Sequence, residues 1–130
     1  MSTYDAVWFT PPAPVARVRL RNLETRAEVH DVPMLLDSGA DVSLVPHTYV
    51  AQLGIPIDLE QRYEVVGFNG AASTATVVRL ELRLQERTFR GQFLLTDQAW
   101  GILGRNTLNN IVVSLDGPRL TWTVPRTGKP

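Results

Sequence analysis

The chain has 130 residues, of which 13 are basic and 13 acidic, and it contains no cysteine. One domain is the default at this length. The balanced charge argues against a nucleic-acid-binding surface, which usually carries a basic excess, and the absence of cysteine excludes disulfides and thiolate metal sites. No apolar run approaches a membrane span, and the opening residues MSTYD lack the basic-then-apolar pattern of a signal peptide. We therefore expect a cytoplasmic protein with no metal, nucleic-acid or membrane partner.

Prolines dominate the first segment of the chain. Residues 11–14 read Pro-Pro-Ala-Pro, which excludes a helix and favours an extended conformation. The apolar cluster Val7–Phe9 lies just before them, and we expect it to dock against the domain because permanent exposure of its aromatic rings is unfavourable. This divides the chain into an N-terminal arm, residues 1–14, a domain, residues 15–125, and a tail, residues 126–130.

The first half of the domain predicts short strands and one helix. Val18 and Leu20 alternate with arginines, which is the period of a half-buried strand, and residues 26–32 return as its hairpin partner. We expect Pro33 to end that strand and residues 34–36 to form a separate short one. Residues 42–45 predict another strand, and Pro46 begins a helix that stops at Gly54.

The second half predicts two longer hairpins. Residues 63–66 and 73–85 flank an Asn-Gly pair, the strongest short-range hairpin signal, and residues 88–95 pair back. A short helix is expected at residues 106–110, followed by strands at 111–115 and 120–124. Many short strands with two short helices predict an all-β domain.

The main candidate functional residues of the chain lie in one turn that contains an aspartate. Two leucines lead into Asp37, so the sequence predicts a carboxylate carried into an apolar interior, where it is costly unless paired or hydrogen-bonded. Ser38 supplies a hydroxyl that can donate and accept, and Gly39 permits a tight turn. The pattern fits a carboxyl group at the floor of a cleft. Asp, Ser and Gly are also the commonest turn residues, so a plain turn is the open alternative.

Three landmarks stand in a fixed order along the chain. They are Leu-Leu-Asp-Ser-Gly-Ala-Asp at residues 35–41, the Asn-Gly hairpin, and Ile-Leu-Gly-Arg-Asn at residues 102–106. Over residues 15–125 this combination resembles the retropepsins, the single-lobe aspartic proteases of retroviruses and their cellular relatives. The resemblance implies an all-β, single-lobe acid-protease barrel with two short helices. It also implies a homodimer in which each subunit contributes one catalytic aspartate and one flap.

The resemblance also assigns roles to individual residues. Asp37 is the expected catalytic residue, and Ser38, Gly39 and Ala40 complete the active-site loop. Asp41 is expected to form a structural pair with Arg105. The expected substrate-binding and flap residues are Asp41, Val66, Gly67, Phe68, Asn69, Gly70 and Ala71.

The expected function is that of an aspartic endopeptidase acting on peptide or protein substrates without a metal or other cofactor. Only one Asp-Ser/Thr-Gly triplet occurs in the chain, so the second carboxylate must be Asp37 of another copy. The apolar runs Val7–Phe9 and Leu120–Val124 are the candidate interface segments. Two alternatives remain open: a catalytically inert dimerisation or peptide-binding module with the same fold, and an unrelated β-barrel with a chance Asp-Ser-Gly turn.

Overall fold

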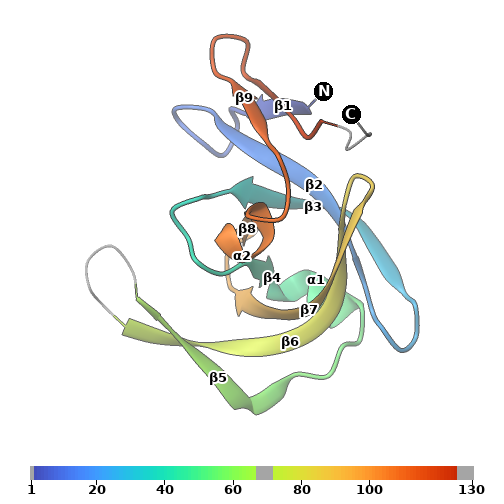
Figure 1. Ribbon diagram of the computed structural model, residues 1–130. Coiled ribbons are helices and arrows are strands. Elements are labelled where there is room, and N and C mark those ends of the chain that lie inside the picture. The colour runs from blue at the N-terminus through green and yellow to red at the C-terminus, as the bar shows by residue number, and fades with distance from the viewer. Residues whose placement is uncertain (1, 67–71, 126–130) are drawn as a thin grey trace.

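The computed structural model describes the backbone of residues 2–66 and 72–125, and the side chains of these residues apart from 58–66 and 72–74 (Figure 1). Strands dominate it, with two short helices, as the sequence predicts. In chain order the elements are β1 (Ser2–Asp5), β2 (Ala13–Arg21), β3 (Glu28–Leu36), β4 (Leu44–Pro46), α1 (His47–Gln52), β5 (Asp58–Val66), β6 (Ala72–Leu84), β7 (Arg87–Thr96), β8 (Gly101–Leu103), α2 (Arg105–Leu108), β9 (Ser114–Asp116) and β10 (Thr121–Thr123).

Six of these strands close into a barrel. They pair in the order β6-β7-β4-β8-β3-β2, and β2 then pairs with β6, which completes the ring. The closing register places Leu20 opposite Leu82, and both side chains are fully buried. Full closure removes the free sheet edges that these strands would otherwise expose. β5 pairs with β6 outside the ring (Figure 1).

The barrel interior is filled by the alternating apolar positions that the sequence predicts. Val18 and Leu20 of β2 are buried while Arg19 between them is half-buried, and in β6 the exposed Arg79 and Arg83 alternate with buried leucines. The buried apolar residues of β6 are Val77, Val78, Leu80, Leu82 and Leu84. The period-2 alternation of both strands is therefore confirmed.

Both predicted helices are present. Pro46 sits at the N-cap of α1 with φ −64°, a value that its ring fixes in advance, and Gly54 follows the helix with φ +66°. A glycine adopts this left-handed conformation without the steric penalty of a Cβ atom, so it ends the helix as predicted. α2 follows the Gly104–Arg105 junction and is a single turn.

Several strand boundaries differ from the prediction: for example, β5 begins at Asp58 and not at residue 63. β3 runs without a break through Pro33, which pairs with Arg17, so the expected interruption there is wrong. β8 pairs with β3 only from Met34 onward, so one edge of β3 carries no ladder at Pro33, and a residue without an N–H group is tolerated at such an edge. The strand expected at residues 111–115 is shorter and later, since β9 begins at Ser114.

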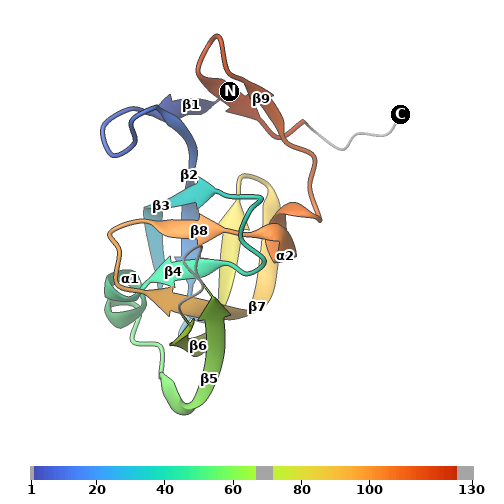
Figure 2. The same ribbon diagram turned by 90° about the vertical axis from the view of Figure 1, so that its left-hand side faces the viewer.

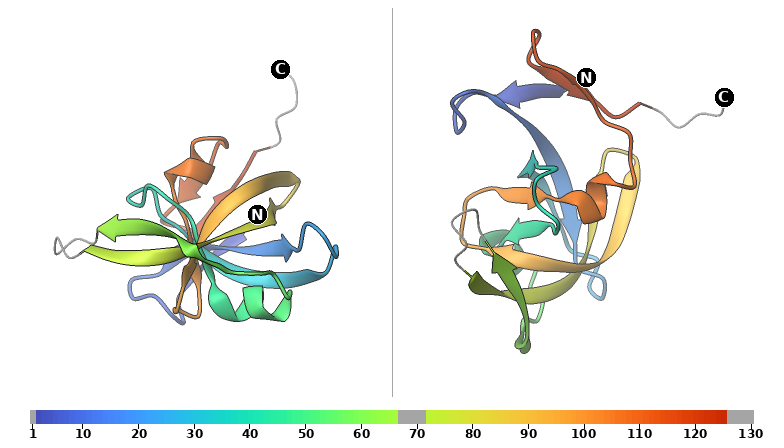
Figure 3. Two further views of the ribbon diagram at one scale, coloured as in Figure 1. Left: turned by 90° about the horizontal axis from the view of Figure 1, so that it is seen from below. Right: turned by 60° about the vertical axis from the view of Figure 1, so that its left-hand side comes forward.

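A small second sheet projects from the barrel. β1 pairs with β2 on one side and with β10 on the other, and among the described residues β9 pairs with β10 alone (Figures 2 and 3). The segment predicted as an arm therefore contains a sheet strand. Phe9 packs against Trp100 with ring centroids 4.9 Å apart, but Val7 is 88% exposed and Trp8 is exposed as well, so the expected docking is wrong for these two residues. The tail, residues 126–130, lies outside the described residues.

Candidate active site

The Asp37 turn begins where β3 ends. β8 runs parallel to β3, with Leu35 opposite Ile102 and Leu36 opposite Leu103, and the Asp37 N–H extends this ladder by donating to the Leu103 carbonyl at 3.0 Å. Parallel strands are joined by a long crossover connection, so residues far apart in the sequence become neighbours at this pairing. The two Gly-containing landmarks of the sequence are thus brought side by side, and Figure 2 shows the β3–β4 connection next to α2.

Two hydrogen bonds between residues close together in the sequence shape the turn itself. The Gly39 N–H donates to Oδ1 of Asp37 at 2.9 Å, and the Ala40 N–H donates to the Asp37 carbonyl at 3.1 Å. One carboxylate oxygen is therefore held in a fixed direction. Asp37 is half-buried, while Ser38 and Gly39 are exposed. The carboxyl group lies near the surface of the single chain, not in its apolar interior as the leucine pair predicts, because Leu35 and Leu36 are themselves only half-buried.

The start of α2 closes against the turn through the backbone. The Arg105 N–H donates to the Ala40 carbonyl at 2.8 Å, and the Asn106 N–H donates to the Asp41 carbonyl at 3.3 Å. A Cβ atom at Gly104 would overlap the Val42 carbonyl group and lie 2.9 Å from the Ala40 oxygen. Only glycine fits this close approach of two backbone segments.

The predicted ion pair between Asp41 and Arg105 takes a different form. Arg105 Nη1 donates to the Ser38 carbonyl at 2.8 Å, and the ion pairs among the described side chains do not join Arg105 to Asp41. Both side chains are exposed. A carbonyl oxygen in the turn accepts the guanidinium here, which leaves the Asp41 carboxylate facing solvent in the single chain. Arg105 therefore ties α2 to the Asp37 turn through the Ser38 carbonyl and not through Asp41.

Ser43 joins the same two segments from the inside, and the sequence analysis missed it. Its buried Oγ donates to Oδ1 of Asn106 at 2.8 Å, accepts from the Gly104 N–H at 3.0 Å and lies 3.0 Å from Oγ1 of Thr107. A buried hydroxyl needs such partners because burying it unpaired is costly. The available signal was a lone hydroxyl within the apolar run Val42–Val45.

The flap prediction falls mostly outside the described residues. Val66 is the last residue of β5 and pairs with Ala72, the first residue of β6. Gly67, Phe68, Asn69, Gly70 and Ala71 lie in the part that the structure does not describe. The β5–β6 hairpin that should carry the flap is present, and the role of these residues stays a prediction.

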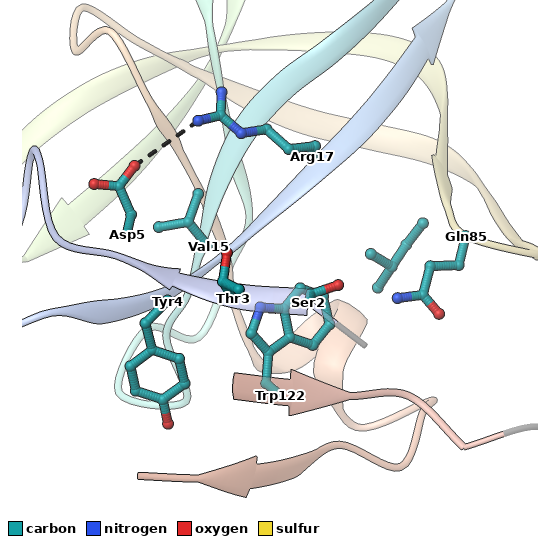
Figure 4. Close-up of a pocket in the computed structure, with 9 residues that line it drawn as sticks. Ser2, Thr3, Tyr4, Asp5, Val15, Arg17, Gln85 and Trp122 are labelled. Carbon is teal, nitrogen blue, oxygen red and sulfur yellow. Dashed lines mark ion pairs between the residues drawn. The ribbon is translucent and has the colours of Figure 1, made fainter. Parts of the chain in front are cut away.

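A cavity of about 360 Å³ lies between the barrel and the small sheet (Figure 4). Its apolar lining residues are Val15, Leu84 and Trp122, and the charged residues Asp5 and Arg17 line it as well. Nε1 of Trp122 is buried there without a hydrogen-bond partner among the described residues. Asp37 is not among the residues that line this cavity, so it is distinct from the Asp37 turn.

The fold and the turn together define a class, the single-lobe acid proteases of the retroviral type. The chain is similar in fold to EIAV protease in complex with the inhibitor HBY-793, with a TM-score of 0.56 at 21% identity over 75% of this chain and 86% of that one. The Simian Foamy Virus (mac) protease gives a TM-score of 0.50 at 17% identity over 74% of this chain and 92% of that one. No curated protein matches the chain.

Residues 23–110 match the family model described as "gag-polyprotein putative aspartyl protease", and the chain belongs to this family. The match includes the Asp37 turn, the β5–β6 hairpin and all of α2. In the described residues, no helix combines the length and apolar character needed to cross a membrane.

Proposed function

We propose that the chain is an aspartic endopeptidase whose active site contains Asp37 from each of two identical subunits. The observation that carries the proposal is the Asp37 turn, in which one carboxylate oxygen is held by the Gly39 N–H at 2.9 Å while the neighbouring residues stay exposed. Such a carboxyl group is oriented and still open to a partner. The family match, which spans this turn, supports the same reading.

The chemistry follows from bringing two carboxyl groups together. Two carboxyl groups within hydrogen-bonding distance do not both ionise, because their negative charges repel, so the two groups share one proton. The ionised member takes a proton from water, which attacks the peptide carbonyl, and the protonated member donates to the carbonyl oxygen. We propose that the Gly39 carbonyl accepts a hydrogen bond from the substrate backbone. We also propose that the Ser38 hydroxyl connects the two Asp37 turns across the dimer. Asp41 and residues 66–71 complete the proposed substrate-binding set.

The small sheet supplies the proposed dimer interface. β9 pairs only with β10 in the described chain, so its other edge has free N–H and C=O groups that favour pairing with another strand. Leu115 of β9 is 61% exposed and Val112, just before it, is 62% exposed. A two-fold interface is self-complementary, so a second β9 meets the first. Trp122 is buried within its own chain, which moves the proposed interface from Leu120–Val124 towards Leu115.

The decisive experiment mixes active and inactive subunits. The purified chain is assayed on a fluorogenic peptide library at increasing protein concentration, and Asp37→Asn is expected to lower the rate at least about a hundredfold. Asp97→Asn, at an exposed loop carboxylate, is the matched control and keeps the wild-type rate. Excess Asp37→Asn protein added to the wild type should suppress its activity, because mixed dimers hold only one functional carboxyl group.

The pH profile and the oligomeric state complete the test. The rate should follow a bell-shaped curve, since one carboxyl must be ionised and the other protonated. Sedimentation at the assay concentration should find a dimer. Wild-type activity that is indifferent to added Asp37→Asn protein would refute the shared site. A dimer that cleaves none of the library would favour the inert dimerisation or peptide-binding module.

A further inference from the structure

Arginines gather on the outer face of the barrel where β2 and β6 close the ring. The register places Arg19 directly opposite Arg83, and residues directly opposite across two strands point to the same face. Arg17, two residues before Arg19, shares this face. Like charges in directly opposed positions destabilise a sheet unless something between them compensates.

The next rung of the same ladder has that compensation. Arg21 is opposite Glu81, and its Nε donates to Oε2 of Glu28 at 2.9 Å. Glu81 also accepts from Nε of Arg90 at 2.8 Å. This rung therefore alternates positive and negative side chains, and each carboxylate has a close guanidinium partner.

The Arg19–Arg83 rung has weaker compensation. Arg19 reaches Glu28 only at 3.7 Å, and that carboxylate already accepts from Arg21. Arg17 reaches Asp5 at 3.8 Å, and Figure 4 marks this pair with a dashed line. Nε of Arg83 donates to the neutral Gln85 carbonyl at 3.0 Å. At this rung the positive charge exceeds the negative charge supplied by the chain.

A hollow of about 180 Å³ lies between these side chains. Its charged and titratable lining residues are Arg17, Arg19, Arg83, His30 and Asp31. The lining thus holds three arginines and one acidic residue, Asp31, while the carboxylates of Asp5 and Glu28 outside the lining reach Arg17 and Arg19 only at 3.8 and 3.7 Å. The chain as a whole has no net charge, so this excess is local.

We propose that the hollow is a binding site for a phosphate-type oxyanion. The guanidinium group presents a rigid fork of N–H donors that matches phosphate geometry, and three arginines are among the residues that line this one small space. A bound dianion would also offset the repulsion between Arg19 and Arg83. The site is separate from the Asp37 turn, which contributes no residue to it, so the proposal does not depend on proteolysis.

Thermal unfolding at constant ionic strength tests the site, with sodium phosphate replacing sodium chloride. The wild-type melting temperature should rise with phosphate, and Arg83→Gln should lower the phosphate affinity by roughly tenfold or more, as expected for a lost charge-assisted hydrogen bond. Arg79→Gln is the matched control, since Arg79 lies on the same face of the same strand but opposite Gln92. Phosphate also stabilises proteins generally by exclusion from their surface, and that contribution is common to all three proteins.

Two further comparisons make the test specific. In chloride alone, Arg83→Gln should melt at or above the wild-type temperature, because it removes a like-charge pair, so the order of the two proteins reverses in phosphate. Arg83→Lys keeps the charge but loses the fork and should bind with intermediate affinity. O-phosphoserine is assayed beside inorganic phosphate: stronger binding of the ester assigns the site to a phosphorylated side chain, and stronger binding of the ion assigns it to free phosphate. An equal phosphate response in the wild type, Arg83→Gln and Arg79→Gln would overturn the proposal.

Discussion

The Asp37 turn and the small β1–β10–β9 sheet differ in how completely one chain satisfies them. The turn is bonded on both sides, by β8 through Leu103 and by α2 through Arg105. The small sheet ends in β9, which pairs on one side only within the part of the chain that the structure describes, and Leu115 is exposed. Within a single chain, the hydrogen bonds around the Asp37 turn are therefore formed, while one edge of β9 has no partner strand among the described residues. What the chain still lacks for the proposed chemistry is a second subunit, not a rearranged turn.

This difference has a physical origin in the kind of contact each region uses. Backbone N–H and carbonyl groups make most of the bonds that hold the turn, and the side chains of Asp37 and Arg105 add one each. The small sheet depends on a few short strand pairings, such as Ser2 with Trp122. Short ladders gain little from hydrogen bonds alone, so burial of apolar side chains must supply the remaining stability.

The close approach at Gly104 offers the largest expected effect on the turn. Gly104→Ala would force a Cβ atom into the Val42 carbonyl group, and backbone cannot move aside as a flexible side chain can. We expect a loss of about 3 kcal/mol in the free energy of unfolding, measured by denaturant titration. Gly117→Ala is the control, since a Cβ there meets nothing within 4 Å. Equal stability of the two variants would mean that α2 does not need to touch the turn so closely.

Ser43 provides the second test of the turn. Ser43→Ala leaves the Gly104 N–H without its side-chain acceptor and removes the contact with Asn106, at a cost of about 1–3 kcal/mol in unfolding free energy. Ser114→Ala, at an exposed position in β9, should change stability little. Calorimetry of both variants compares the two regions directly. A larger loss at Ser114 than at Ser43 would reverse the comparison between turn and sheet.

The sequence predicted the elements that local patterns specify and missed contacts between distant residues. The alternation in β2 and β6 and the Pro46 and Gly54 signals marked the strands and the first helix correctly. The parallel pairing of β3 with β8 and the Ser43 contacts depend on partners far along the chain, which no local pattern reports. The Arg105 guanidinium donates to the Ser38 carbonyl and not to the Asp41 carboxylate. Both side chains are exposed, and an ion pair in solvent adds little stability.

The open edge of the small sheet gives the third test. Leu115→Lys adds a charge to an exposed edge position, a feature that opposes strand pairing between molecules. We expect the dissociation constant of the proposed dimer to rise roughly tenfold, equivalent to about 1.4 kcal/mol. The unfolding of the monomer should change little. Sedimentation equilibrium measures the first quantity and thermal unfolding the second. Arg119→Lys, which keeps its charge in the nearby turn, is the control. A dimer unaffected by Leu115→Lys would move the interface away from β9.

The smallest expected effect concerns the ion pairs on the outer face of the barrel, which lie apart from the Asp37 turn. The hydrogen bond from Arg21 lowers the pKa of Glu28 below its ordinary value, with attraction to Arg21, Arg19 and His30 adding to it and burial opposing it. A carboxyl group whose pKa is lower in the folded state stabilises the fold above its unfolded pKa, and this contribution disappears as the pH falls through the folded pKa. The stability difference between the wild type and Glu28→Gln should therefore be constant near neutral pH and shrink below about pH 5. Urea titrations at several pH values measure it, with Glu86→Gln in the exposed β6–β7 turn as the control. A difference that stays constant down to the acid-unfolding range would show that Glu28 acts through packing and not through its charge.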